Sequence, residues 1–217
     1  MAVSAGWANN LLFNGGFDTG DLNGWTPFTT ANGTLGVSMP TVVPFLTDGV
    51  NSSNAVRFQV GEAGEDHFSF GGGGISQTVT VPTGQVSFLV DIAAQGGLGA
   101  NMYGGFVQVL LDTKPVLGYD FGALNAGEIK YTTLDFSFVD DSAPHTIALQ
   151  FLRPALADSG TPYQYASNLR LYAGGESGAF LEEVPEPSSW LLFSFGLAVL
   201  CALRGRIRFG RRTPARL

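Results

Sequence analysis

The chain has 217 residues, 45% of them hydrophobic, only 13% charged and 30 of them glycine, which indicates a folded domain with many tight turns and a short appendage. All 18 acidic residues lie before residue 188, against five basic residues in the same part, and this acidic body excludes nucleic acid as a partner. The single cysteine, Cys201, excludes an intramolecular disulfide and a cysteine-based metal cluster.

The chain begins with residues 1–8, MAVSAGWA, whose small side chains are typical of the last part of a cleaved signal peptide. The basic and apolar regions that precede such an end are missing from these residues. We therefore interpret residues 1–8 as a signal-peptide remnant and expect Met1 to be a misassigned start, with the rest of the signal encoded upstream.

Alternation of apolar and polar residues recurs along residues 9–173 and predicts short strands. In QVSFLVDIA, for example, Val86, Phe88, Val90 and Ile92 share one face. The same pattern predicts strands at 56–60, 75–81, 85–93, 106–111, 133–139, 145–151 and 168–172. These are seven strands, and the spacing of about ten residues indicates eight or nine in all. With no sustained helical period before Pro187, they predict an all-β fold, an antiparallel β-sandwich, followed by a single C-terminal hydrophobic helix.

Three motifs resemble the jelly-roll modules of the galactose-binding-like and carbohydrate-binding-module superfamily: NLLFNGGFDTGDLNGWT from Asn10, ISQTVTVPTGQVSFLVDI from Ile75, and NLRLY from Asn168. The resemblance implies a jelly roll over 9–173. It also implies a structural calcium ion held by Asp18 and Asn168, although Ser167 stands where the family has an acidic residue. The alternative is that Asp18, like Asp21, accepts N–H groups in a turn.

The same resemblance implies a polysaccharide ligand, and proteins stack sugars on exposed aromatic rings. The candidates are Tyr103, which glycines flank, and Tyr119 and Tyr163, which we expect in loops together with Tyr165. Trp25 is interpreted as a core residue.

Residues for catalysis are few. His67 and His145 lie far apart in the sequence, and the segment from Glu62 to His67 has four ionisable groups that could bind a metal or transfer protons. A solvated acidic loop is the simpler interpretation. No nucleophile elbow or zinc-protease motif occurs, and the glycine run at 71–74 lacks the lysine of a phosphate loop. We therefore predict no catalytic residues and no enzymatic activity.

The C-terminal part begins with small and acidic residues at 174–183, interpreted as a linker. Residues 188–203 are uncharged and apolar all round, and as a helix they would extend about 24 Å, barely enough to cross a membrane. A cytoplasmic stop is predicted from the arginines that follow, Arg204, Arg206, Arg208, Arg211 and Arg212, before a tail at 213–217. A core helix, a permanent anchor and a sorting signal are the competing interpretations.

The third interpretation is supported by residues 184–212, which resemble the PEP-CTERM sorting signal of Gram-negative bacteria. The resemblance is carried by Val184, Pro185, Glu186, Pro187 and Ser188, then Gly196 and the arginines. It implies an exosortase-type membrane enzyme as partner, a transient inner-membrane anchor, and delivery to the cell surface or extracellular matrix. The sequence thus predicts an exported protein with a non-catalytic binding or structural sandwich. A carbohydrate-binding module with a specific ligand is the alternative, and a polysaccharide hydrolase the least favoured one.

Overall fold

The computed structural model describes residues 9–64, 69–140, 142–154 and 160–173, which all belong to one compact unit, Met1–Gly178. The predicted signal-peptide remnant, linker, C-terminal helix and sorting motif lie outside these residues. In the part of the chain that is described, no helix is long and apolar enough to cross a membrane.

The described part of the chain is built from strands. Their bounds are β1 Thr26–Thr29, β2 Gly33–Thr34, β3 Thr41–Phe45, β4 Ser53–Phe58, β5 Gly61–Glu62, β6 Gly71–Thr80, β7 Gly84–Gln95, β8 Met102–Tyr103, β9 Phe106–Leu111, β10 Lys114–Asp120, β11 Ala123–Leu124, β12 Ile129–Asp140, β13 Pro144–Arg153 and β14 Tyr163–Ala173.

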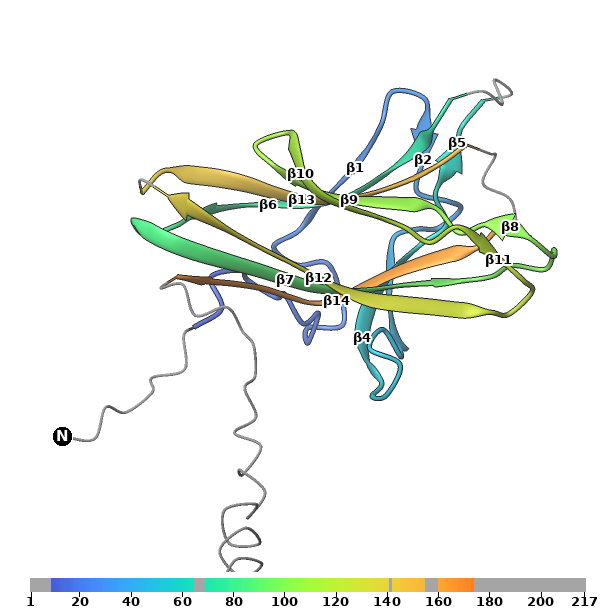
Figure 1. The fold of residues 1–217 in the computed structure, drawn as a ribbon, viewed down its shortest axis with the longest axis horizontal. Helices are drawn as coiled ribbons and strands as arrows, with labels where there is room; N and C mark the ends of the chain where they lie inside the picture. The colour runs from blue at the N-terminus through green and yellow to red at the C-terminus, as the bar shows by residue number, and fades with distance from the viewer. Residues whose placement is uncertain (1–8, 65–68, 141, 155–159, 174–217) are drawn as a thin grey trace, which may run out of the picture. The chain divides into compact units, whose positions relative to one another are not determined.

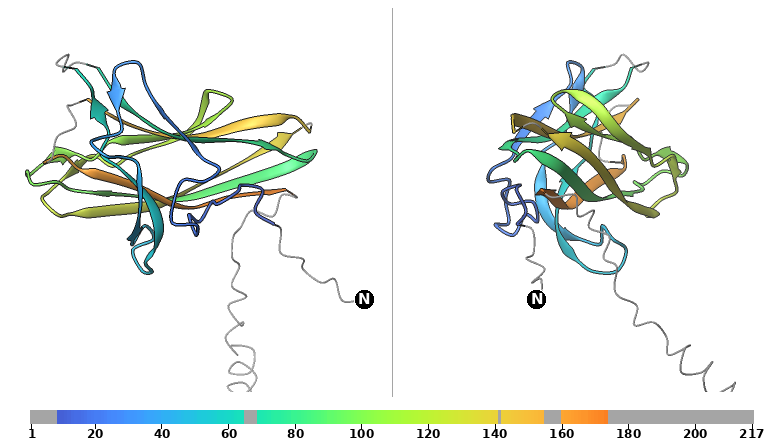
Figure 2. Two further views of the ribbon diagram at one scale, coloured as in Figure 1. Left: turned by 180° about the vertical axis from the view of Figure 1, so that it is seen from behind. Right: turned by 60° about the vertical axis from the view of Figure 1, so that its left-hand side comes forward.

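Two five-stranded antiparallel sheets pack face to face as a sandwich (Figure 1). The first sheet has the order β1-β6-β13-β9-β10, and the second has the order β12-β7-β14-β4-β3. Strands β2 and β5, and strands β8 and β11, form two small additional ladders. Seen from behind in Figure 2, the opening segment and strand β3 lie on the side away from β10 and β12. The predicted all-β sandwich is confirmed.

The core consists of the alternating apolar residues that the sequence pattern places on one face of each strand. Val86, Phe88 and Ile92 of β7 are fully buried. Phe58 of β4 contacts Phe151 of β13, with ring centroids 5.2 Å apart, and this pair joins the two sheets. Burial of such side chains supplies most of the free energy that favours folding.

The opening motif closes the sandwich against the last strand. Asn10 accepts the N–H of Leu171 and donates to the carbonyl of Leu169, while the N–H of Leu169 donates to the carbonyl of Gly15. A side chain at Gly15 would meet the Leu169 carbonyl oxygen at 2.0 Å, so only glycine fits there. Trp25 is 5% exposed, which confirms its predicted place in the core.

Three strands of the two large sheets were not predicted, namely β1, β3 and β10. Each of them borders a sheet and contains a proline, and β10 has few buried residues, so the alternating pattern is weak. The glycine run at 71–74 is the first part of β6, where the backbones of β1 and β13 pass too close for side chains.

Candidate ligand-binding face

The outer face of the sheet β12-β7-β14-β4-β3 carries a group of aromatic side chains on small neighbours. Ala93 of β7 lies directly opposite Tyr165 of β14, whose neighbour on the other side is Arg57 of β4. Ala55, two residues from Arg57, packs with Ala93 and Tyr165, and these small side chains leave room for the ring. The ring of Tyr165 stacks on Phe45 of β3, with centroids 3.5 Å apart and planes inclined by 6°. The Tyr165 hydroxyl donates to Gln95 at 3.0 Å. Burial raises the pKa of Tyr165 to about 12, so its hydroxyl remains a donor at physiological pH.

Beside this stack, a cation lies over a second tyrosine ring. The guanidinium carbon of Arg57 is 5.2 Å from the centroid of Tyr163, which places the charge over the ring face. The Nε atom of Arg57 is buried and has no hydrogen-bond partner among the described residues. We call Phe45, Arg57, Tyr163 and Tyr165 the aromatic shelf.

Next to the aromatic shelf, the outer face is covered by the segment between β3 and β4, residues 46–52. Its Thr47 hydroxyl bonds to that of Ser167 in β14, and both residues are fully buried. The backbone of Gly49 lies against the ring of Tyr131 in β12, where a side chain would meet the ring at 2.2 Å. The segment therefore crosses β14 and β7 and separates the aromatic shelf from the far end of this face.

Beneath this segment lies a buried carboxylate that the sequence pattern placed among the polar residues. Asp91 of β7 accepts the Thr133 hydroxyl at 2.6 Å and the Asn168 amide at 2.7 Å, and it is 6% exposed. Asn168 has a φ of 51° in the irregular part of β14, between Ser167 and Arg170. The hydrogen bond from Asn168 to Asp91 therefore fixes the irregular backbone between Ser167 and Arg170, which joins the two regular halves of β14.

The two candidate calcium ligands, Asp18 and Asn168, differ in their exposure to solvent and in their hydrogen-bond partners. Asp18 is exposed in the opening loop, whereas the Asn168 amide donates to Asp91. The opening loop does meet the last strand, as the resemblance implies, through Asn10 and Leu169. No group of three or more acidic, histidine or cysteine side chains suited to a metal ion occurs in the described ranges. Calcium ligation by Asp18 and Asn168 stays a prediction. Asp21 accepts the Thr19 hydroxyl and the Asn23 N–H, as expected of a turn residue.

The three candidate tyrosines lie in different places. Only Tyr163 belongs to the aromatic shelf. Tyr119 lies in β10 and packs edge-on against Phe121, and Tyr103 lies in β8 against Phe70, with ring centroids 6.2 Å apart. The expectation that Tyr119, Tyr163 and Tyr165 lie in loops was wrong, because Tyr119 belongs to β10 and the other two belong to β14. The alternating signal was weak there because most of β10 is exposed and the first half of β14 is mostly buried. Sequence reasoning missed Phe45 and Arg57 as shelf residues, and it named Tyr165 only as a residue expected in a loop.

The interpretation of the segment from Glu62 to His67 as a solvated acidic loop was wrong for its first residue. Glu62 is 2% exposed, and its Oε1 accepts the N–H of Ser69 at 2.9 Å and the Ser69 hydroxyl at 3.0 Å. Residues 65–68 lie outside the described residues. Glu62 therefore closes a backbone turn and does not face solvent.

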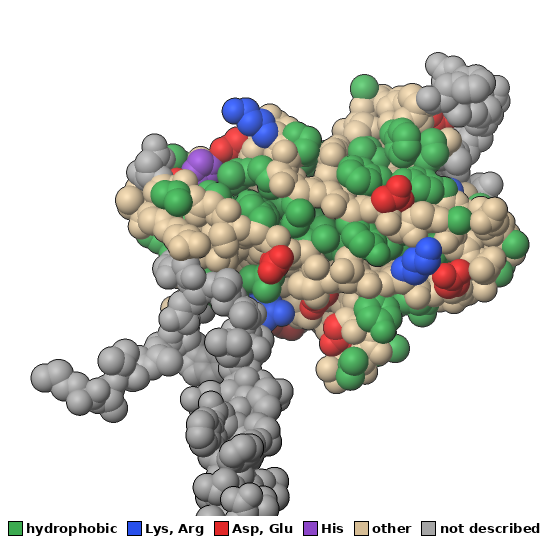
Figure 3. All heavy atoms as spheres, viewed as in Figure 1, with side chains coloured by type: hydrophobic (Ala, Val, Ile, Leu, Met, Phe, Trp, Pro, Cys, Tyr) green, Lys and Arg blue, Asp and Glu red, His purple; other side chains and the backbone are tan. Residues whose placement is uncertain are grey.

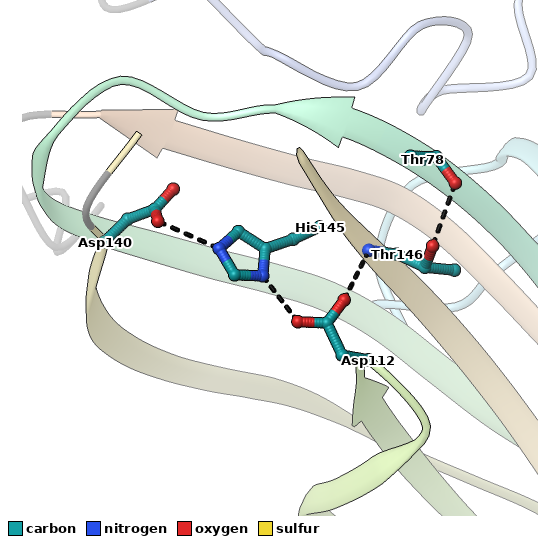
Figure 4. Close-up of polar contacts among 5 residues, drawn as sticks. All are labelled: Thr78, Asp112, Asp140, His145 and Thr146. Carbon is teal, nitrogen blue, oxygen red and sulfur yellow. Dashed lines mark hydrogen bonds and ion pairs between the residues drawn. The ribbon is translucent and has the colours of Figure 1, made fainter. Parts of the chain in front are cut away.

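His145, at the start of β13, lies between two carboxylates (Figure 4). Its Nδ1 is 2.6 Å from Asp112 and its Nε2 is 2.8 Å from Asp140. Asp112 is in the β9–β10 turn and Asp140 ends β12, so the imidazole ties the two sheets together at this end. The bonds to Asp112 and Asp140 raise the pKa of His145, although burial opposes them. Burial alone would raise the pKa of Asp112, but the Thr146 N–H and His145 outweigh it and lower that pKa.

We expect the His145 cluster to stabilise the fold most strongly between about pH 4 and pH 6.5. The pKa of His145 is raised by folding, so its contribution is complete below the unfolded pKa and is lost as the pH rises through the folded one. The pKa of Asp112 is lowered by folding, so its contribution is present above the unfolded pKa and is lost as the pH falls through the folded one.

The measurement is urea unfolding of the full chain and of His145→Gln at pH 5.5 and pH 8.5. Because the Asp112 side chain is 48% exposed and partly screened, we expect the variant to lose about 1 kcal/mol at pH 5.5 and less at pH 8.5. An equal loss at the two pH values would show that the charge on His145 contributes nothing.

Comparison with known families gives one match, between residues 183–208 and the PEP-CTERM protein-sorting motif. The comparison with curated proteins gave no match. Among solved structures, TmCBM61 in complex with beta-1,4-galactotriose is similar with a TM-score of 0.45 and 15% identity, over 76% of this chain and 99% of that chain. A family 16 carbohydrate-binding module is similar with a TM-score of 0.40 and 16% identity, over 75% of this chain and 99% of that module. The CBM22-1 xylan-binding domain from Paenibacillus barcinonensis Xyn10C is similar with a TM-score of 0.41 and 12% identity, over 78% of this chain and 97% of that domain. The chain therefore carries a PEP-CTERM protein-sorting motif, as Val184 to Ser188 and the arginines after them predict.

Proposed function

We propose that this protein is exported, held briefly in the inner membrane, and delivered by its sorting motif to the cell surface or extracellular matrix. There the sandwich binds a polysaccharide on the aromatic shelf without cleaving it. The observation that supports binding is the aromatic shelf itself, where Arg57 lies over Tyr163 beside the stacked pair of Phe45 and Tyr165. The sorting motif at 183–208 supports the destination.

The chemistry of the shelf suits a saccharide. Sugar rings have an apolar face of C–H groups that stacks on aromatic rings, and a border of hydroxyls that needs hydrogen-bond partners. Tyr163 is half-buried and offers a ring, while the guanidinium of Arg57 and the amide of Gln95 offer donors beside it. The domain is acidic as a whole, but the shelf carries the cation of Arg57 and the neutral amide of Gln95. These groups favour a saccharide that bears hydroxyl or acidic groups.

The geometry near the shelf favours binding over catalysis. Glycoside hydrolysis uses two carboxyl groups on either side of the scissile bond, and both must be free to react. Both oxygens of Asp91 are engaged by Thr133 and Asn168 beneath the covering segment. In the other polar cluster, both ring nitrogens of His145 are engaged by carboxylates, which leaves no nitrogen to activate a nucleophile.

The test is affinity electrophoresis of the full chain in detergent, in gels that contain xylan, galactan or mixed-linkage β-glucan. We expect retardation in at least one gel, and we expect Tyr163→Ala to weaken binding at least tenfold because loss of the ring removes a stacking contact of about 0.5–1.5 kcal/mol as well as buried apolar area. Tyr172→Ala is the matched control, since Tyr172 lies on β14 and on the same face, opposite Ser87.

The alternative site predicted from the sequence is tested in the same gels. If Tyr103→Ala abolishes retardation and Tyr163→Ala does not, the ligand binds at the β8 end and the shelf is not the site. If no gel retards the wild-type protein, binding of these three polysaccharides by the shelf is contradicted.

A further inference from the structure

The four border strands of the two sheets differ in how they resist pairing with another chain. Exposed borders are usually blunted by proline, by short length, by bulges or by charge. Strand β1 has four residues including Pro27, strand β3 has five including Pro44, and strand β10 has Pro115 and a register shift just after it. Strand β12 has twelve residues, no proline and no register shift, and its charges are limited to Lys130, Asp135 and Asp140.

Strand β12 is long, regular and unpaired on one side. It pairs with β7 through twelve consecutive residues without a register shift, and it is the last strand in its sheet. Within the described ranges, no backbone hydrogen bond outside this ladder involves residues 130–139. Figure 3 shows apolar side chains along the same side of the sandwich, in the space between the two sheets. The partly buried residues there include Leu117, Phe136 and Phe138.

We propose that β12 pairs antiparallel with β12 of a second copy of this chain, about a twofold axis at Leu134, to form a continuous ten-stranded sheet across the dimer. In this register Ile129 lies opposite Val139 at both ends of the ladder, so two of the three exposed apolar residues of the strand cover each other. The third, Tyr131, lies opposite Ser137. Thr133 lies opposite Asp135 and Lys130 lies opposite Phe138, so between residues 129 and 139 no charge faces a like charge. Asp140, just outside that ladder, lies opposite Glu128, but its carboxylate is bonded to His145.

The neighbouring symmetric register fits less well. A shift of the axis to Asp135 would place the two Asp135 carboxylates directly opposite each other, which destabilises a strand pair. It would also pair Lys130 with Asp140, but neither side chain is available. Lys130 donates to the carbonyls of Phe121 and Ala123, and Asp140 is bonded to His145. The sequence of β12 therefore favours an axis at Leu134 over one at Asp135.

This dimer has a consequence for the face described above. A twofold axis perpendicular to the sheet keeps both outer faces on the same side, so that two aromatic shelves would face one polysaccharide surface. Two linked sites bind a repeating polymer more tightly than one. The pairing itself depends only on β12, and it stands or falls independently of saccharide binding.

The first test is sedimentation of the full chain in detergent over a range of concentrations. We expect a monomer–dimer equilibrium, and we expect Val139→Lys to raise the dimer dissociation constant at least tenfold because each dimer loses this contact twice. The matched control is Val37→Lys, which changes a valine that is 84% exposed away from β12, against 82% for Val139. A wild-type monomer at all concentrations, or equal effects of the two variants, would overturn the proposal.

The second test reads the register directly, in a Cys201→Ser background. Ile129→Cys and Val139→Cys proteins are oxidised separately and as a mixture. We expect a disulfide dimer only in the mixture, because residues 129 and 139 face each other, whereas identical positions lie about 33 Å apart. Association through the apolar C-terminal segment, or with another strand, would give no such selectivity and would refute the pairing.

Discussion

Alanine in place of Pro185, Glu186 and Pro187 is expected to leave the protein full-length in the inner membrane, whereas the wild type loses the segment from residue 184 onward. Proline does not fit inside a helix and keeps the residue before it extended, so the sequence predicts an extended backbone for the motif before the apolar stretch. A processing enzyme needs such an extended and accessible site. The effect should be close to all or none.

The measurement is the intact mass of protein recovered from membrane and surface fractions of the producing bacterium. Pro214→Ala is the matched control, since it removes a proline beyond the arginines and outside the matched residues 183–208. A wild-type protein that keeps its full mass at the cell surface would show that the segment is a permanent anchor. The export proposal would survive that result, but the proposal of processing would not.

Replacement of Phe151 by alanine is expected to lower the free energy of unfolding by about 3–5 kcal/mol. Phe151 is fully buried in β13 and contacts Phe58 across the sandwich, so its removal opens a cavity between the sheets that neither sheet can close alone. This loss is a large fraction of the stability of a domain of this size.

Urea unfolding followed by tryptophan fluorescence measures this loss, with Phe13→Ala as the matched control. Phe13 is 58% exposed in the opening segment, and we expect its replacement to cost less than about 1 kcal/mol. If the two variants lose the same stability, the contact between Phe58 and Phe151 does not join the sheets as described.

Strands with one buried and one polar face were predictable because their residues alternate. Strand β13 illustrates this, since Ile147, Leu149 and Phe151 all proved to be buried. Border strands such as β10, where most residues are exposed, gave little signal. Strand β14 was predicted only in its second half, because Tyr163 and Tyr165 place aromatic residues on its outer face and mask the alternation.

The sites were less predictable than the strands. The aromatic shelf joins Phe45, Arg57 and Tyr163, which come from three strands and meet only through the register of β3, β4 and β14. His145 likewise meets Asp112 because two turns lie at the same end of the sandwich. The spacing of these residues in the sequence predicts neither contact, because each contact depends on which strands are neighbours in the fold.

The sequence by itself determined two properties of this protein. Its local alternation of apolar and polar residues required a two-layered β-fold, and its C-terminal order of prolines, apolar residues and arginines identified a sorting motif, because both signals are contained in short contiguous segments. Only the tertiary structure decided which tyrosine lies beside a cation, which histidine bridges the two sheets, and which border strand is left unprotected. Those properties depend on pairings between distant segments, and burial of the shared core selects these pairings only when the whole domain folds.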